Sequence, residues 1–398
     1  MAGLRADGTG GDLLVRNIGR LTTWDRPVAT DAALLAHDGR VVWTGADRDV
    51  PAEADGVPEL DAQGAAVLPG FVDCHTHLVW AGSRRDDLRA RIGGTEGYTP
   101  GGIASTVAAT RAATTEDLRA RAQARCDRAA STGTTTIEVK SGYGLTVDDE
   151  LRVLDVAASL QGPAVTTTYL GAHVVPDGRD RRDYVAEVVD TVPRAAERGA
   201  SWCDVFCDDG AFTVDEARLI LTTARSAGLG LRMHAEQLAH TGAAALAAEL
   251  GCASADHLDH VTAADAAALA AAGVVAVLVP VCSLYTRSGR WGHAAALREA
   301  GCELAIATDC NPGTAWCESM PYAMQLACLE MGLPVETVLR AATLGGARAL
   351  RYDDVGHLAP GARADLVVVD GEHEVDLIAH LGTNGIIRTV IGGRPFVA

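Results

Sequence analysis

Lysine is almost absent from this chain of 398 residues: Lys140 is the single lysine, and arginine supplies every other fixed cation. The net charge is −18 at neutral pH, from 52 acidic and 34 basic residues. This acidity argues against nucleic acid or an anionic membrane surface as the main partner. It leaves a small anionic molecule open as a ligand, because one local arginine can bind an anion inside an acidic protein.

Two kinds of segment are also missing. No run of about 18 or more apolar residues is present that could span a membrane, and residues Met1 to Gly11 lack the apolar stretch of a signal peptide. The ten cysteines are scattered, apart from Cys203 and Cys207. We therefore expect reduced, mostly buried thiols rather than disulfides. Together these absences predict a cytoplasmic protein.

The middle of the chain alternates short apolar, β-branched runs with alanine-rich helical stretches. The eight apolar runs are Ala65–His77, Thr134–Lys140, Val165–His173, Trp202–Asp208, Gly230–Glu236, Ala253–Leu258, Val274–Pro280 and Glu303–Asn311. The helical candidates are Glu116–Ala130, Val147–Leu160, Tyr184–Arg198, Val214–Ala227, Thr241–Leu250, Ala263–Ala272 and Ala294–Glu299. Such alternation is typical of parallel βαβ units. Eight units in roughly 280 residues predict an α/β fold with a (β/α)8 TIM-like barrel; a doubly wound open sheet is the competing topology.

Short strand-like runs also occur near both ends of the chain. The segment His37-Asp-Gly-Arg40 has the Asp-Gly pair of a tight β-hairpin turn. We expect the two ends to pair into a small β-sandwich domain of residues 1–66 plus 350–398, beside a barrel domain of residues 67–349. The first connection of the barrel, about residues 79–110, is predicted to be a long glycine-rich loop, and loops of this length are often functional.

Polar side chains recur where the expected barrel strands end, and in a barrel these ends form one rim. They are His75, His77, His173, His234, His257 and Asp309. His75 and His77 are spaced i and i+2 on a strand, so they share a face. An ordinary polar pair at a strand end is the alternative interpretation of these two. Three imidazoles and a carboxylate suit one Zn²⁺ or Fe²⁺ with a position left for water. The predicted metal ligands are His75, His77, His234 and Asp309.

Two residues of this rim are predicted to be catalytic. A divalent cation lowers the pKa of bound water towards neutral and polarises a carbonyl oxygen. Asp309 can accept the proton of that water, and His257 can stabilise the developing charge. His257 is therefore predicted to be a proton carrier or a marginal metal ligand.

Several longer motifs give a more specific indication. They are Pro69-Gly-Phe-Val-Asp-Cys-His-Thr-His77, Val79-Trp-Ala-Gly-Ser-Arg84, Glu138-Val-Lys-Ser-Gly-Tyr-Gly-Leu145, Leu170-Gly-Ala-His173, His234-Ala-Glu-Gln237, Asp256-His-Leu258 and Ala307-Thr-Asp-Cys-Asn-Pro-Gly313. With these motifs the chain resembles the metal-dependent amidohydrolase superfamily and, within it, the imidazolonepropionase family. The resemblance implies hydrolysis of 4-imidazolone-5-propanoate to N-formimidoyl-L-glutamate in histidine breakdown, which opens a cyclic amide C–N bond.

The resemblance also implies substrate contacts and a homodimer. The contacts to the ring substrate are implied for Arg84, Tyr143, His173 and Gln237, and those to the open-chain product for Asn311, Gly313 and Thr314. A guanidinium such as that of Arg84 suits the propionate of the substrate. Gln237 stands where some relatives carry Glu. An amide can orient a substrate but cannot take a proton, which leaves Asp309 or His257 as the base.

Three alternatives remain at this point. A two-metal cyclic amidohydrolase would carry a carboxylated lysine, usually on the fourth strand, but Trp202–Asp208 has no lysine and Lys140 ends the second strand. We therefore expect one metal per chain. Another mononuclear amidohydrolase, or a deaminase acting on a small N-heterocycle, shares the ligand set; a deaminase would release ammonia. An inactive scaffold would have lost ligands, and this chain has lost none.

Overall fold

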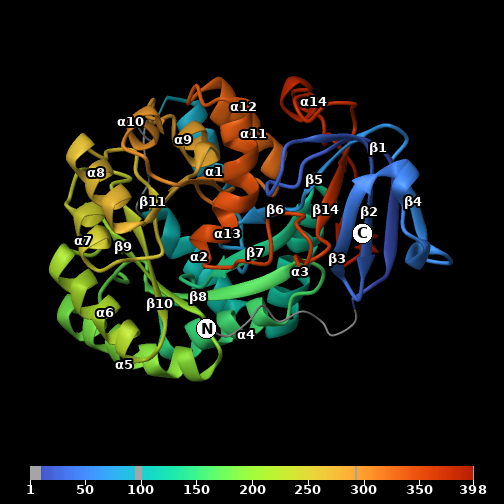
Figure 1. The fold of residues 1–398 in the computed structure, drawn as a ribbon. Helices are drawn as coiled ribbons and strands as arrows, with labels where there is room; N and C mark the ends of the chain where they lie inside the picture. Colours follow the sequence, from blue (N-terminus) through green and yellow to red (C-terminus); the bar gives the residue numbers. More distant parts are fainter. Residues whose placement is uncertain (1–9, 95–100, 292–293, 398) are drawn as a thin grey trace.

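The computed structural model describes residues 10–94, 101–291 and 294–397, which form two β-sheets with helices around one of them (Figure 1). Eight strands of the described residues form a parallel sheet in chain order. They are β6 (Phe71–Asp73), β7 (Thr134–Lys140), β8 (Ala164–Ala172), β9 (Trp202–Cys207), β10 (Gly230–Ala235), β11 (Ser254–His257), β12 (Val275–Leu278) and β13 (Leu304–Ile306). Each strand lies close to an apolar run of the sequence, because these runs are buried on both faces.

The two edges of the parallel sheet meet beside the first histidine pair. The backbone N–H of Asp309 donates to the carbonyl of His75 at 3.0 Å, and that of His77 donates to the carbonyl of Cys310 at 2.9 Å. Thr76 and Cys310 form a parallel bridge at the same place. The sheet therefore closes into a barrel at the carboxyl ends of β6 and β13. The predicted barrel is confirmed, and the doubly wound open sheet is excluded.

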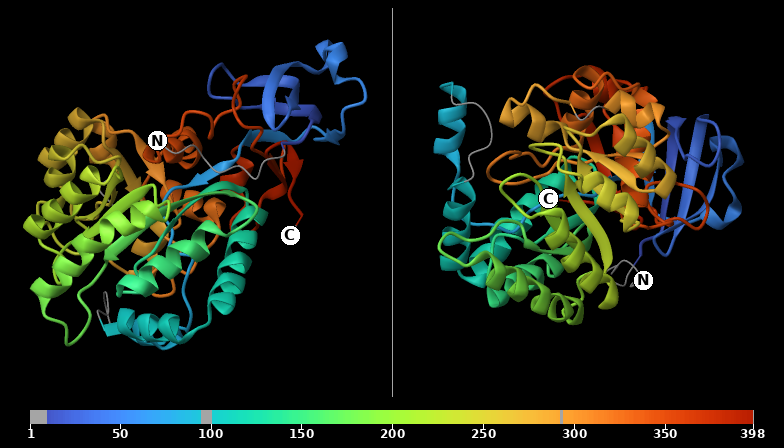
Figure 2. Two further views of the ribbon diagram at one scale, coloured as in Figure 1. Left: turned by 90° about the horizontal axis from the view of Figure 1, so that it is seen from below. Right: turned by 90° about the vertical axis from the view of Figure 1, so that its left-hand side faces the viewer.

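Helices cover the outside of the barrel (Figures 1 and 2). Those that match predicted helical stretches are α3 (Thr115–Ser131), α4 (Val147–Ala158), α5 (Arg181–Glu197), α6 (Val214–Ser226), α7 (Ala243–Glu249), α8 (Ala263–Ala272) and α10 (Ala294–Glu299). Threonines at the N-caps of four of them accept a backbone N–H from the first turn, which explains where these helices begin. No helix in the described part of the chain is both long enough and apolar enough to cross a membrane.

Some helices were not expected from the sequence. The prediction of one long loop over residues 79–110 is wrong, because α1 (Arg85–Ile92) and α2 (Gly101–Ala112) lie there; residues 95–100 fall outside the described residues. Glycine pairs at residues 93–94 and 101–102 stand on either side of residues 95–100, and α1 is rich in arginine and aspartate. These residues interrupt the apolar periodicity from which a helix is predicted. Further elements are α9 (Pro280–Thr286), α11 (Met320–Leu329), α12 (Val335–Arg340), the π-turn Ala341–Gly345 and α13 (Gly346–Ala349).

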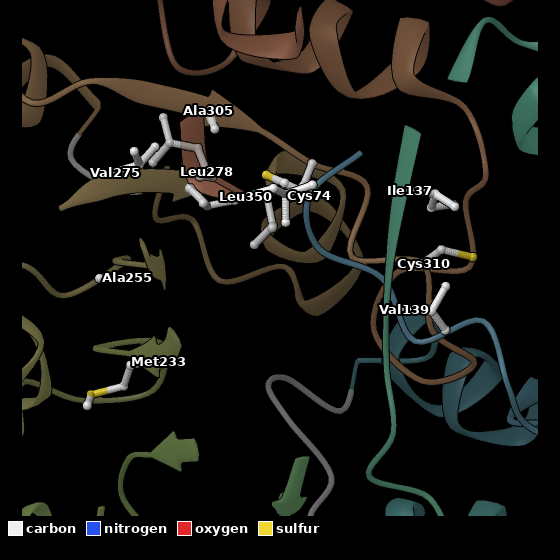
Figure 3. Close-up of a cluster of buried hydrophobic side chains, with 14 of the residues drawn as sticks. Cys74, Ile137, Val139, Met233, Ala255, Val275, Leu278, Ala305, Cys310 and Leu350 are labelled. Carbon is white, nitrogen blue, oxygen red and sulfur yellow. The ribbon is translucent and has the colours of Figure 1, made fainter. Parts of the chain in front are cut away.

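The main hydrophobic core lies between the barrel and its helices. Successive residues of a strand point to opposite sides. Ile137, Val139 and Met233 belong to a buried apolar cluster that includes helix residues such as Leu118 (Figure 3). The alternate residues of the same strands point to the barrel interior, where many of them are polar. The ten cysteines are all free and most are buried, as expected.

The second sheet is built from both ends of the chain, as predicted. Its strands are β1 (Leu13–Leu21), β2 (Ala29–His37), β3 (Arg40–Ala46), β4 (Glu59–Asp61), β5 (Ala66–Pro69), β14 (Leu366–Val369), β15 (Ile386–Ile391) and β16 (Arg394–Pro395). β5 pairs parallel with β1 and antiparallel with β14, which joins the two ends. Asp38 (φ 48°) and Gly39 (φ 73°) form the predicted tight hairpin turn. Short helices Asp47–Asp49, Ala52–Ala54 and α14 (Asp376–Ala379) complete this part.

The first expected strand, Ala65–His77, is in fact two strands in different sheets. The chain passes from β5 to β6 at Gly70, where an added Cβ would collide with the side chain of Thr135. The predicted boundary between residues 66 and 67 thus falls inside β5, a strand of the mixed sheet. The division into domains at this point and at residue 350 stays a prediction; residues 1–9 and 398 lie outside the described residues.

Candidate metal centre and active site

The histidine pair follows β6 in an extended segment. Between the two histidines, the hydroxyl of Thr76 donates to the carbonyl of Glu138 on β7 at 2.6 Å. The imidazoles of His75 and His77 lie together on the other side, with ring centroids 5.4 Å apart. The i, i+2 spacing therefore places both rings on one face, as the sequence predicted.

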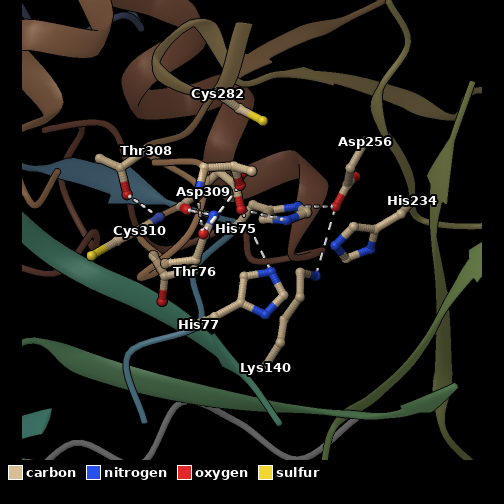
Figure 4. A network of polar contacts seen from close by, with 12 residues as sticks. His75, Thr76, His77, Lys140, His234, Asp256, Cys282, Thr308, Asp309 and Cys310 are labelled. Atoms are coloured by element: carbon tan, nitrogen blue, oxygen red, sulfur yellow. Dashed lines mark hydrogen bonds and ion pairs between the residues drawn. The ribbon is translucent and has the colours of Figure 1, made fainter. Parts of the chain in front are cut away.

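The other two predicted ligands, His234 and Asp309, lie far away in the sequence but reach the same point (Figure 4). The Nε2 atoms of His75 and His77 each lie 3.5 Å from Oδ1 of Asp309. The ring of His234 lies 4.5 Å from that of His75 between centroids. One ligand atom from each of His75, His77 and His234 falls within 4.8 Å of the others, and the same holds for His75, His257 and Asp309. All four predicted ligands thus lie together, with His257 beside them.

The chemistry of this donor set fits a divalent cation. His75 Nε2 and both ring nitrogens of His257 are buried without a hydrogen-bond partner. Burial holds the pKa of His75, His77 and His257 well below the usual range, so these imidazoles are neutral, which is the state that binds metals. Burial also raises the pKa of Asp309 to about 7, and a neighbouring cation would favour its charged form.

Two buried carboxylates contact the far side of the imidazoles. Asp256 Oδ2 lies 2.6 Å from His75 Nδ1, and Asp204 Oδ2 lies 3.1 Å from His234 Nδ1. A carboxylate on Nδ1 leaves Nε2 of the same ring for a metal. Burial alone would raise the pKa of Asp204, but His234 and Lys140 hold that pKa well below its usual range. The sequence analysis did not predict that Asp204 and Asp256 contact the imidazoles. The strand register would have indicated it for Asp256, which pairs directly with His234.

A pocket opens beside the histidines. Its lining holds the predicted residues His77, Arg84, Tyr143, His173, His234, Gln237, His257, Asp309, Asn311, Gly313 and Thr314. His75 lies fully buried behind them. Ile103 of α2 and Phe206 of β9 also line the pocket and were not predicted. Ile103 escaped notice because it lies in the stretch that was expected to be a loop. The structure thus gathers every predicted substrate-contacting residue in one place.

Comparison with known proteins identifies the family. The sequence profile of the Amidohydrolase family matches residues 66–395. The chain belongs to the amidohydrolase family. It is 48% identical over 393 residues to the imidazolonepropionase of Salinispora arenicola, covering 96% of this chain and 98% of that one. It is 47% identical over 363 residues to the imidazolonepropionase of Saccharopolyspora erythraea, covering 90% and 92%. The family resemblance indicated by the sequence motifs is confirmed.

The fold agrees with this assignment. The crystal structure of atrazine chlorohydrolase from Arthrobacter aurescens in complex with zinc superimposes with a TM-score of 0.73 at 18% identity, covering 97% of this chain and 95% of that one. At this identity the likeness concerns the fold alone. The present amidohydrolase is thus an enzyme of a metal-dependent family that acts on a small molecule, with a histidine-rich candidate metal site at the expected rim.

A buried carboxylate holds the turn that carries Tyr143 in this amidohydrolase. Glu150, on α4, accepts the backbone N–H groups of Gly142, Gly144 and Leu145 at 2.8, 2.6 and 2.7 Å. Gly142 has φ 108°, a conformation that favours glycine. The turn is therefore fixed from below, and the Tyr143 ring is held at the pocket wall.

A similar contact fixes the backbone at Gln237. Asp208 accepts the N–H groups of Gln237, Leu238 and Ala239 at 2.6, 2.9 and 3.1 Å. This anchors the backbone at Gln237, so only its side chain is free to adapt.

The segment after Asp309 is held in the same way. Asn311 Oδ1 accepts the N–H groups of Gly313 and Thr314 at 2.9 and 2.8 Å. The buried Arg91 donates to the carbonyl of Gly313 at 2.6 Å. The backbone around the three predicted product contacts is therefore rigid.

Replacing Glu150 with Gln tests how the Tyr143 turn is held. Hydrogen bonds to a charged acceptor contribute about 1.5–3 kcal/mol each. We expect the amides of Gly142, Gly144 and Leu145 to exchange hydrogen about tenfold faster or more in Glu150→Gln. Hydrogen exchange resolved by residue measures this. Asp148→Asn, an exposed change on the same helix, is the control; equal exchange in both variants would contradict the role of Glu150.

Proposed function

We propose that this amidohydrolase hydrolyses 4-imidazolone-5-propanoate to N-formimidoyl-L-glutamate with one Zn²⁺ or Fe²⁺ per chain. The observation that carries the proposal is a single pocket lined by three of the four candidate metal ligands and by a buried arginine, Arg84, with the fourth ligand, His75, buried directly behind them. The near-half identity to imidazolonepropionases over almost the whole chain supports this substrate.

His75, His77, His234 and Asp309 would hold the metal. When bound, the cation supplies Lewis acidity, which lowers the pKa of water and polarises a carbonyl oxygen. A single ion is supported by the environment of Lys140, whose ammonium lies 2.7 Å from Asp204 and is fully buried. An ammonium engaged in this way as a cation argues against a carboxylated lysine that bridges two metals.

The substrate ring and its propionate meet different parts of the pocket. Arg84 donates from Nε to Asp87, and its remaining N–H groups suit the propionate carboxylate. Burial lowers the pKa of His173 to about 4, so this ring is neutral. His173 Nδ1 lies 2.8 Å from the carbonyl of Gly142 and donates to it. His173 Nε2 is then an acceptor for an N–H group of the ring, with Tyr143 beside it at 5.4 Å between centroids.

Proton transfer falls to residues of the rim. Water adds to the ring carbonyl, the C–N bond breaks, and the leaving nitrogen takes up a proton as the new carboxylate forms. Asp309 accepts the proton of the attacking water, and His257, with no partner on either ring nitrogen, stabilises the developing charge and can return a proton. Gln237 orients the ring, because its amide cannot act as a base.

The decisive experiment is an ultraviolet assay of imidazolone propionate consumption by the purified protein, with and without chelator. We expect activity that is lost on metal removal and restored by Zn²⁺ or Fe²⁺, with about one ion per chain in metal analysis and no release of ammonia. Turnover that persists in metal-free protein would contradict the metal. Ammonia release would favour a deaminase, and two ions with a carboxylated Lys140 would favour a dinuclear enzyme.

Asp309→Asn removes the anionic ligand and the proton acceptor together. We expect kcat to fall by about three orders of magnitude or more while the circular dichroism spectrum is unchanged. Asp86→Asn, at an exposed aspartate of α1, should leave kcat unaltered. Turnover of the Asp309 variant at the wild-type rate with metal bound would refute both roles.

Arg84→Ala removes the proposed partner of the propionate. A charge-assisted bidentate contact is worth about 1.5–3 kcal/mol, so we expect KM to rise about tenfold to a hundredfold and kcat to change less. The neighbouring Arg85 is exposed, and Arg85→Ala is the matched control. Steady-state kinetics decide the point: an unchanged KM in Arg84→Ala would exclude the carboxylate contact.

A further inference from the structure

The barrel interior below the candidate metal ligands holds charges where apolar layers are usual in this fold. Five ionisable side chains from β7, β9, β10 and β11 meet there, and each is fully buried. They are Glu138, Lys140, Asp204, Arg232 and Asp256. Side chains two residues apart on a strand point to the same side. Glu138 and Lys140 therefore share the inward face of β7, and Arg232 shares the inward face of β10 with His234. The mechanism described above uses none of the five.

Lys140 contacts all three carboxylates of this cluster, and Figure 4 shows it beside Asp256 and below the histidines. Its Nζ lies 2.7 Å from Asp204 Oδ2, 2.8 Å from Glu138 Oε1 and 3.6 Å from Asp256 Oδ2. The ammonium donates a hydrogen bond to Glu138 and forms ion pairs with Asp204 and Asp256. Lys140 is the single lysine of the chain.

Two of these carboxylates are the ones that contact the imidazoles. Asp204 contacts Nδ1 of His234, and Asp256 contacts Nδ1 of His75. We propose that Lys140 is a positioning residue for the metal: it fixes Asp204 and Asp256 and thereby orients His234 and His75 with Nε2 towards the ion. This inference rests on the metal site of the proposed function and extends it to a residue that touches neither metal nor substrate.

The second buried cation of the cluster contacts only one of these two carboxylates. Arg232 donates to Asp256 Oδ2 at 3.2 Å, and it also donates to the backbone carbonyls of Cys74 and Ala349 at 2.7 and 3.0 Å. Its ion pairs within 4 Å are with Asp256 and Glu138 among the described residues. Arg232 thus ties β10 to β6 and to α13. Lys140 is the cation that contacts both imidazole-bound carboxylates.

Simple electrostatics and the positioning role predict opposite effects of removing the ammonium. Loss of a positive charge near a cation site would tighten metal binding by Coulomb attraction alone. Loss of a residue that orients the ligands through their hydrogen-bond partners weakens metal binding, typically about 10- to 100-fold. The sign of the change therefore separates the two.

The test measures Zn²⁺ affinity of metal-free protein against a chelating indicator, with thermal unfolding of the same samples. We expect Lys140→Met to bind Zn²⁺ about 10- to 100-fold more weakly than wild type. Arg125→Met is the control, because Arg125 is a buried cation that donates to the carbonyls of Leu78 and Trp80 outside this cluster. We expect its affinity to stay within about threefold of wild type. Unchanged or tighter binding in Lys140→Met, or equal weakening in both variants, would overturn the proposal.

A second pair keeps the test valid if Lys140→Met fails to fold. The cluster holds three carboxylates and two cations, so Glu138→Gln/Lys140→Met retains its net charge of −1 while both imidazole-bound carboxylates remain. We expect the double variant to bind Zn²⁺ at least about tenfold more weakly than Glu138→Gln alone. Equal affinities would refute the role of Lys140. Wild-type protein that binds no metal would instead refute the proposed function, and this inference with it.

Discussion

The closure of the barrel between His75 and Asp309 is the contact on which the site depends. The backbone of Asp309 donates to the carbonyl of His75, and the side chains of the same two residues are candidate ligands of one ion. Backbone pairing therefore fixes the spacing of donors that lie far apart in the sequence. Asp309 (φ 53°) and His257 (φ 77°) adopt left-handed backbone conformations, each of which costs about 1–3 kcal/mol in a residue with a side chain. Such strain persists only where the surrounding structure determines it fully, and the closed rim provides that structure.

The alternation of strand residues explains how one barrel holds both a core and an ionic interior. Outward-facing residues such as Ile137 and Val139 pack in the apolar cluster shared with the helices. The inward residues Glu138 and Lys140 are charged and completely buried. Buried ion pairs contribute little to net stability, because the loss of hydration offsets their attraction. The cluster is therefore better explained by the site above it: three carboxylates against two cations leave a negative charge beneath neutral imidazoles, which favours a cation there.

The rim was predictable from the sequence, and the layer beneath it was not. His234 and Asp309 could be assigned because each ends an apolar run and parallel strands end on one rim. Asp256 lies 181 residues from His75, its partner, and such a pairing follows from strand register, which the sequence does not reveal. The local pattern also failed to predict α2, which begins with a glycine pair, and Ile103 of that helix was therefore not predicted to line the pocket. The break at Gly70 could not be predicted either, because β5 and β6 form one continuous apolar run in the sequence although they belong to different sheets.

Gln237 belongs to the part of the pocket that is proposed to orient the substrate, and not to the part that transfers protons. Its backbone is fixed by Asp208, and its side-chain Nε2 lies 3.5 Å from Cys282 Sγ. An amide there can hydrogen-bond a ring but carries no titratable proton, so the proposed proton transfer is assigned to Asp309 and His257 on the rim that the barrel closure holds in place. The turns held by carboxylates and amides can then differ among amidohydrolases without disturbing the rim. This division is consistent with a shared fold at 18% identity, because the barrel constrains the metal end of the pocket while the loops constrain the substrate end.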